Sequence, residues 1–187
     1  MSTIWIVIIV VAILIIGIIS IYNKLVRLRE NRDNAFADID VQLKQRHDLV
    51  PQLINTVKGY MDHEAGTLKD VTAARQGAVD ASTVNDKIAA EKELTSALSG
   101  LNIQVEAYPD LKASDNFTQL QNELSDIENK LAAVRRFFNS STKELNVSVQ
   151  RFPNVVFTGM FGFKEEPMFD LGVEKREQFD EAPDVSF

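Results

Sequence analysis

The chain has 187 residues and a formal net charge of −7, with 25% charged and 45% hydrophobic residues. This length is enough for one modest domain with appendages. Cysteine is absent, which excludes a disulfide framework and any cysteine-based metal site. The soluble part shows no basic patch, so we expect no nucleic-acid partner.

The first predicted element is a membrane-spanning helix at residues 4–21. This stretch, IWIVIIVVAILIIGIISI, carries no charge, and as a helix it would extend about 27 Å, close to the hydrocarbon thickness of a bilayer. A secretory signal peptide would need a basic start and a small-residue cleavage site, which the flanking residues do not offer. We therefore predict an uncleaved anchor over residues 1–22, bounded by Ile4 and Trp5 at one end and by Ile21 and Tyr22 at the other.

The residues after the span predict its orientation. The positive-inside rule places clusters of lysine and arginine on the cytoplasmic side of a membrane. Such a cluster follows the span immediately, and it comprises Lys24, Arg27, Arg29 and Arg32. We expect the N-terminus outside, everything from residue 23 onward in the cytoplasm, and the lipid bilayer as a partner.

Beyond the anchor, apolar residues recur at alternating steps of three and four, which is typical of helix bundles and coiled coils. One helix is predicted to run to about residue 63 and to break at Gly66. Shorter helices follow over about 67–78 and 83–108, with Thr83 as an N-cap and Pro109 at the end. A last long helix, about 114–152, is terminated by Pro153. The apolar stripes are Phe36, Ile39, Leu43, Val50, Leu53, Val57 and Tyr60; Leu94, Leu98, Leu101, Val105 and Tyr108; and Phe117, Leu120, Leu124, Ile127, Leu131, Val134 and Phe138, continued more weakly by Ser141, Leu145, Ser148 and Phe152.

These elements predict an all-α chain. Residues 23–153 are expected to form an elongated, antiparallel, coiled-coil-like bundle of about four helices. The first and last helices are the longest, so an up-down-up-down path would return Phe152 close to the bilayer. Fusion of the two middle helices into one would contradict this topology.

Pro51 lies within the first apolar stripe and leaves two interpretations open. The proline either kinks one continuous helix or lies in the first turn of a new helix capped by Asp48. We prefer the kinked helix, because the apolar spacing passes through the proline without a phase change. Arg46 is the polar occupant of the stripe, and Glu123 and Glu128 are the carboxylates considered as its partner.

Residues 154–187 differ in composition and are expected to form a separate, irregular, Phe-rich and acidic tail. Seven of the eleven phenylalanines lie from residue 152 onward, and residues 164–187 carry three basic and eight acidic side chains. The tail either caps the bundle or docks on a neighbouring protomer or the membrane, since a large exposed apolar patch needs a partner. The candidate protomer contacts are Phe157, Phe161, Phe163 and Phe169.

The residue spacing does not favour an enzyme. His47 and His63 are sixteen residues apart, about 24 Å along a helix, and cannot share one metal there. A nucleophile elbow and a glycine-rich phosphate loop are both missing. We expect no catalytic activity, no cofactor and no small-molecule substrate. A metal-dependent hydrolase is the enzymatic alternative, ranked third, after the two non-enzymatic functions given below.

Several motifs together resemble the bacterial LemA family. They are RHDLVPQLINTVKGYMDHE (46–64), AAR (73–75), EAYPDLKASDNFTQLQNEL (106–124), IENKLAAVRRFFN (127–139), RFP (151–153) and GF (162–163). The resemblance implies a single-span protein of the bacterial cytoplasmic membrane, with an elongated helical-bundle domain and no established enzymatic activity.

The resemblance also implies a role for the polar residues of these motifs. Buried polar groups cost free energy unless they are paired, so several on one seam would fix the register between helices. The residues expected to do so are Arg46, Asp48, His63, Glu64, Arg75, Glu128 and Arg135. We expect a non-enzymatic scaffold that forms a membrane-bound homo-oligomer, with an adaptor or regulator of a membrane protease or stress-response membrane protein as the alternative.

Overall fold

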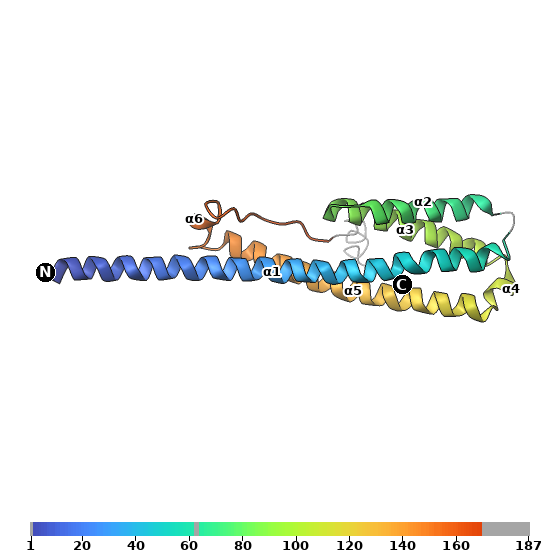
Figure 1. The fold of residues 1–187 in the computed structure, drawn as a ribbon, viewed down its shortest axis with the longest axis horizontal. Helices are drawn as coiled ribbons and strands as arrows, with labels where there is room; N and C mark the ends of the chain where they lie inside the picture. Colours follow the sequence, from blue (N-terminus) through green and yellow to red (C-terminus); the bar gives the residue numbers. More distant parts are fainter. Residues whose placement is uncertain (1, 62–63, 170–187) are drawn as a thin grey trace, which may run out of the picture. The chain divides into compact units, whose positions relative to one another are not determined.

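The structure is a computed structural model that describes residues 2–61 and 64–169. Every regular element in these ranges is a helix, which confirms the all-α prediction for the described part of the chain (Figure 1). Two compact units are present; their described residues are 2–41 with 131–168, and 42–61 and 64–130 with 169. The predicted domain boundaries after residues 22 and 153 stay a prediction. The helices are α1 (Ser2–Lys58), α2 (Ala65–Asp80), α3 (Val84–Val105), α4 (Pro109–Lys112), α5 (Asp115–Gln150) and α6 (Val155–Thr158).

Two helix starts follow from local capping and turn residues. Thr83 is the N-cap of α3, and its Oγ1 accepts a hydrogen bond from the backbone N–H of Asp86 at 3.1 Å, which confirms the predicted cap. Pro109 lies in the first turn of the short helix α4, where its missing N–H costs nothing. Helix α3 ends at Val105, earlier than the predicted end at about residue 108. The short helix α4 was not predicted from the sequence.

The predicted break at Gly66 is wrong. Helix α1 ends at Lys58, just before Gly59, and Gly66 lies in the first turn of α2. The apolar stripe of α1 changes its last member accordingly. Tyr60 is exposed, while Met61 is 1% exposed and occupies the core position that the regular spacing had assigned to Tyr60.

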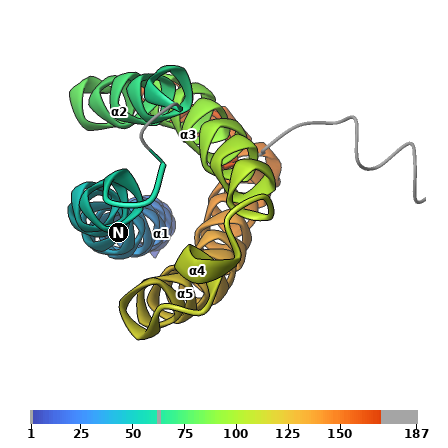
Figure 2. The ribbon, with the colours of Figure 1, turned by 90° about the vertical axis from the view of Figure 1, so that its right-hand side faces the viewer.

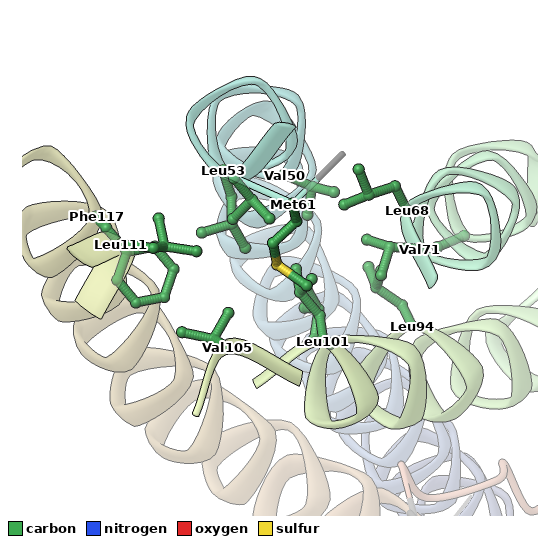
Figure 3. Close-up of a cluster of buried hydrophobic side chains, with 13 residues drawn as sticks. Val50, Leu53, Met61, Leu68, Val71, Leu94, Leu101, Val105, Leu111 and Phe117 are labelled. Carbon is green, nitrogen blue, oxygen red and sulfur yellow. The ribbon is translucent and has the colours of Figure 1, made fainter. Parts of the chain in front are cut away.

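The second unit is built around one continuous apolar core to which five helices contribute (Figure 3). Figure 2 views these helices end-on, with α3 between α2 and the beginning of α5. Each fully buried Leu or Val side chain stabilises the folded state by about 1.5–3 kcal/mol. The buried members are Val50, Leu53, Val57, Met61, Leu68, Val71, Ala78, Leu94, Leu98, Leu101, Val105, Leu111 and Phe117.

The first unit joins the start of α1 to the end of α5. Leu25 and Leu28 of α1 pack with Leu145 and Val149 of α5, and Phe163 completes this cluster. The stripe on α5 continues through buried serines as far as Ser148, and then it stops. Phe152, its last predicted member, is 78% exposed.

The N-terminal part of α1 is exposed among the described residues. In the described residues, α1 alone contains an 18-residue stretch apolar enough to cross a membrane, and none of that stretch is buried. Ile4 and Trp5 at its start are exposed, Ile21 is half-buried against the cluster of the first unit, and Tyr22 is exposed. This exposure is consistent with a single-pass membrane anchor.

Candidate functional site

The most concentrated polar site in the second unit begins at Pro51. Helix α1 continues through this residue, so no new helix starts at Asp48, while the predicted kink stays a prediction. A proline has no N–H, so the carbonyl four residues earlier, that of His47, loses its helical hydrogen-bond donor. Nε of Arg75, from α2, donates to that carbonyl at 2.7 Å. The hydrogen bond that Pro51 removes within α1 is therefore replaced by one between α2 and α1.

The side chain of His47 enters a cluster centred on a buried carboxylate. Glu91 of α3 has only 1% of its side-chain surface exposed. Its Oε2 accepts from Nη1 of Arg46 at 2.8 Å, and its Oε1 lies 2.6 Å from Nε2 of His47. The buried carboxylate of Glu91 thus contacts two neighbouring side chains of α1, Arg46 and His47.

Arg46 extends the cluster to α5. Its Nη2 donates to Oγ1 of Thr95 at 2.9 Å and lies 3.3 Å from Oε2 of Glu128 on α5. Of the two carboxylates considered from the sequence, Glu128 is the one in contact with Arg46. Arg46, His47, Arg75, Glu91 and Glu128 together connect α1, α2, α3 and α5, and we call this set the four-helix polar cluster.

The residues of the four-helix polar cluster differ in their exposure to water. The Arg46 side chain is 4% exposed and that of Glu128 is 48% exposed, so the cluster runs from the core to water. A groove of about 210 Å³ opens beside it and is lined in part by Arg46, Thr95 and Glu128. Both terminal nitrogens of Arg46 already have partners within the protein. The groove therefore gives water access to a compensated ion pair rather than to a free cation.

Glu91 was missed by the sequence analysis, although a signal for it exists. The buried stripe of α3 is Leu94, Leu98, Leu101 and Val105, in steps of four, three and four. One further step of three toward the N-terminus reaches Glu91. A polar residue at a position of an apolar stripe, like Arg46 in α1, is expected to be buried and paired. A search for apolar residues alone does not find such a residue.

The other predicted register residues lie in different surroundings. Arg75 is half-buried and belongs to the cluster, and Glu64 is half-buried just before α2. Arg135 is buried in the part of α5 that belongs to the first unit. His63 lies outside the described residues. Within the ranges 2–61 and 64–169, no three His, Cys, Asp or Glu side chains gather in a way that could hold a metal ion.

Asp48, at the edge of the site, has a lowered pKa. The hydrogen bond from Nζ of Lys44, 2.7 Å from Oδ2, holds the pKa of Asp48 below its usual value of 3.8, and the positive charge of Arg75 acts in the same direction. Both side chains of the Lys44–Asp48 pair are exposed. Because the folded pKa is lowered, the pair stabilises the folded chain above the usual carboxyl pKa. That contribution is lost as the pH falls through the lowered value.

We expect Lys44→Ala to raise the pKa of Asp48 toward 3.8, because the substitution removes the hydrogen bond and the adjacent charge. Carboxyl chemical shifts followed by NMR at low salt measure this change, since salt screens exposed pairs. Lys112→Ala removes the exposed Lys112–Glu106 pair instead and is expected to leave the titration of Asp48 unchanged. Equal titration curves for Asp48 in the wild type and in Lys44→Ala would contradict the assignment.

The contact between Arg75 and the His47 carbonyl predicts coupling to Pro51. Arg75→Ala leaves a carbonyl without its donor and is expected to lower the free energy of unfolding by about 1–3 kcal/mol. In a Pro51→Ala background, the new amide N–H can donate to the same carbonyl, so Arg75→Ala is expected to cost about 1 kcal/mol less. Urea unfolding of the four chains in detergent, followed by circular dichroism, measures the cycle. Lys69→Ala on the same helix is the control, and equal costs of Arg75→Ala in both backgrounds would refute the coupling.

A second group of predicted residues meets in the first unit. The ring of Tyr22 lies edge-on to Phe161 and Phe163, with centroid distances of 5.2 and 6.2 Å. Nη2 of Arg29 donates to the carbonyl of Gly162 at 3.1 Å, and the Arg29 guanidinium lies 4.0 Å from the centroid of the Phe163 ring. Part of the Phe-rich segment is thus held against α1 just after the apolar span.

The basic cluster after the span is divided between two environments. Lys24 and Arg27 are exposed. Arg32 is buried, stands 4.9 Å from the centroid of the Phe138 ring and pairs with Glu166 at 3.7 Å. Arg32 therefore also packs within the fold, a role that the charge pattern alone did not suggest.

The four predicted protomer contacts also differ in exposure. Phe157 and Phe161 are half-buried, with their ring centroids 6.5 Å apart. Phe163 is 5% exposed and Phe169 is 3% exposed within this one chain. The acidic part of the tail, residues 170–187, lies outside the described residues.

Comparisons with known proteins show which family the chain matches. The model of the LemA family matches residues 35–187. The chain is 28% identical over 132 residues to Protein LemA of Metamycoplasma hominis, covering 70% of this chain and 60% of that protein. It is 23% identical over 174 residues to Magnetosome protein MamQ of Magnetospirillum gryphiswaldense, covering 79% of this chain and 64% of that protein. In both cases the match spans less than two thirds of the relative's length.

Proposed function

The chain belongs to the LemA family, and from this premise we propose that it is a non-enzymatic, membrane-anchored scaffold that assembles with copies of itself. The observation that carries the proposal is the apolar stretch at the start of α1, none of which is buried by the protein. Exposure of these about 18 uncharged, mostly aliphatic residues to water would be strongly unfavourable, while the hydrocarbon core of a bilayer offers them an apolar environment. The exposed cations Lys24 and Arg27 support an orientation with the bundle in the bacterial cytoplasm.

The four-helix polar cluster supports a structural role for the bundle. Arg46 and His47, residue types that catalysis could use, are each paired with the buried carboxylate of Glu91, at 2.8 and 2.6 Å. Such pairing commits each group to one geometry and specifies how the helices meet. We infer that the cluster sets helix register in an elongated antiparallel bundle, which acts as a stiff body on the membrane.

Confinement by the anchor favours the proposed self-assembly. A span restricts all copies to one plane in one orientation, which raises their effective concentration and makes weak lateral contacts sufficient. The partly exposed rings of Phe157 and Phe161 remain candidates for these contacts. Phe163 and Phe169 are occupied within their own chain, so they are less suited to this role.

The test is the composition of the particle extracted from native membranes. Native mass spectrometry of the full chain in polymer-encapsulated membrane discs is expected to give several copies of this chain and no stoichiometric foreign protein. Chemical crosslinking in the membrane before extraction should give mainly crosslinks between copies. A single copy bound to a stoichiometric membrane protease or stress-response membrane protein would favour the adaptor function instead. A single copy alone would refute the scaffold.

A further inference from the structure

The segment that follows α5 carries large apolar side chains that the described residues of its own unit leave exposed. Phe152 is 78% exposed, Met160 is 80% exposed, and Val155 and Val156 are each at least half exposed. Phe152, Val156 and Met160 are four residues apart in sequence, and α6 lies between the first and the last of them. A group of large apolar side chains this exposed points to a partner.

The segment is fixed to both long helices, so this surface has a defined place. Nδ2 of Asn154, which is buried, donates to the carbonyl of Ser148 on α5 at 2.8 Å. At the other end, Arg29 of α1 binds the carbonyl of Gly162, whose φ of +70° favours glycine. The exposed side chains are therefore presented by an ordered turn.

That place is the end of the apolar span. Phe161 packs edge-on against Tyr22, and it also lies against the cluster that includes Leu25. Figure 1 shows α6 beside this part of α1. Tyr22 directly follows the uncharged stretch that ends at Ile21, so the segment lies where α1 would leave the hydrocarbon. Aromatic and large apolar side chains are favoured at this depth of a bilayer.

We propose that residues 152–160 form a second membrane contact, which docks on the interface of the same bilayer that the anchor crosses. The occupant is a phospholipid surface rather than another protein, because Phe161 holds the segment beside Tyr22, at the end of the apolar stretch of α1. Exposed Lys24 and Arg27 follow on α1 and match the negative charge of anionic headgroups. Two contacts would hold the first unit in one orientation on the membrane. This inference rests on the membrane anchor of the proposed function.

The absence of cysteine in the chain allows a direct test with single spin labels. Four full-length variants, Phe152→Cys, Met160→Cys, Ile13→Cys and Ile103→Cys, are labelled and placed in nanodiscs of phosphatidylcholine and phosphatidylglycerol. Collisions of each label with oxygen, which concentrates in lipid, and with a water-soluble nickel complex report its depth. Ile103 is the matched control, because it is 72% exposed and lies in the second unit.

We expect the labels at positions 152 and 160 to lose collisions with the nickel complex and to gain collisions with oxygen, as at position 13, while position 103 stays fully accessible to nickel. Labels at 152 and 160 that behave like position 103 would overturn the second contact and leave the anchor intact. A label at position 13 that behaves like position 103 would overturn both. Spin–spin broadening at 160 that disappears on dilution with unlabelled chain, without oxygen contact, would mean that a second copy covers the surface, and it would also overturn the proposal.

Discussion

Glu91→Ala is expected to lower the free energy of unfolding by about 3–5 kcal/mol, because it removes one partner from a buried ion pair. The substitution leaves the guanidinium of Arg46 in the core with only the half-exposed Glu128 as a counter-charge. It also leaves Nε2 of His47 without its hydrogen-bond partner, Oε1 of Glu91. Urea unfolding of the full chain in detergent, followed by circular dichroism, measures the loss.

Two further variants separate this cause from a general weakening of α3. Glu93→Ala changes an exposed glutamate two residues away and is expected to change stability by less than about 0.5 kcal/mol. Replacement of the buried group as a whole, by Arg46→Met, His47→Leu and Glu91→Leu together, is expected to recover much of the lost stability, since apolar side chains need no compensation. A triple variant as unstable as Glu91→Ala would show that an uncompensated charge is not the cause.

The second large effect concerns the anchor. Ile9→Arg combined with Ile13→Arg places two charges near the centre of the span and is expected to disfavour insertion by about 6–8 kcal/mol. After a carbonate wash of membranes, we expect the wild-type chain in the pellet and the variant in the supernatant. Immunoblotting of the two fractions measures this distribution.

The control for the anchor variant carries the same charges on the bundle. Val79→Arg combined with Ile103→Arg changes two exposed apolar residues of the second unit and is expected to leave the chain in the membrane pellet. If the chain with two arginines in its span also stayed in the pellet, its attachment would have to come from elsewhere. Release of the control variant would show that added charge, rather than its position, removes the chain from the membrane.

Sequence patterns predicted elements whose causes are local. The start of α3 followed from one side chain, because Thr83 caps it through its own hydroxyl. The end of α1 was missed because Gly66 was taken as the break, whereas α1 ends just before Gly59 and Gly66 lies in α2. Helix ends depend on turns whose geometry one sequence leaves open.

The candidate site was predictable in part. Arg46 stood out as a polar residue on an apolar stripe, and a carboxylate from another helix was the expected partner. The choice between Glu123 and Glu128 depends on how α1 and α5 are shifted along each other, which is set by packing across the core. Glu91 lay one step beyond an apolar stripe and went unnoticed. Arg75 as the donor to the His47 carbonyl needed the position of α2, which the Pro51 signal alone does not specify.

We propose that α1 crosses the membrane and leaves the bundle in the cytoplasm. Two single cysteines, Ser2→Cys and Ile103→Cys, labelled with a membrane-impermeant maleimide in intact spheroplasts, report on which side of the membrane the N-terminus and the bundle lie. We expect Ser2→Cys to be labelled from outside and Ile103→Cys to be labelled only after the membrane is permeabilised. Labelling of both positions, or of neither, in intact spheroplasts would contradict a single span with this orientation.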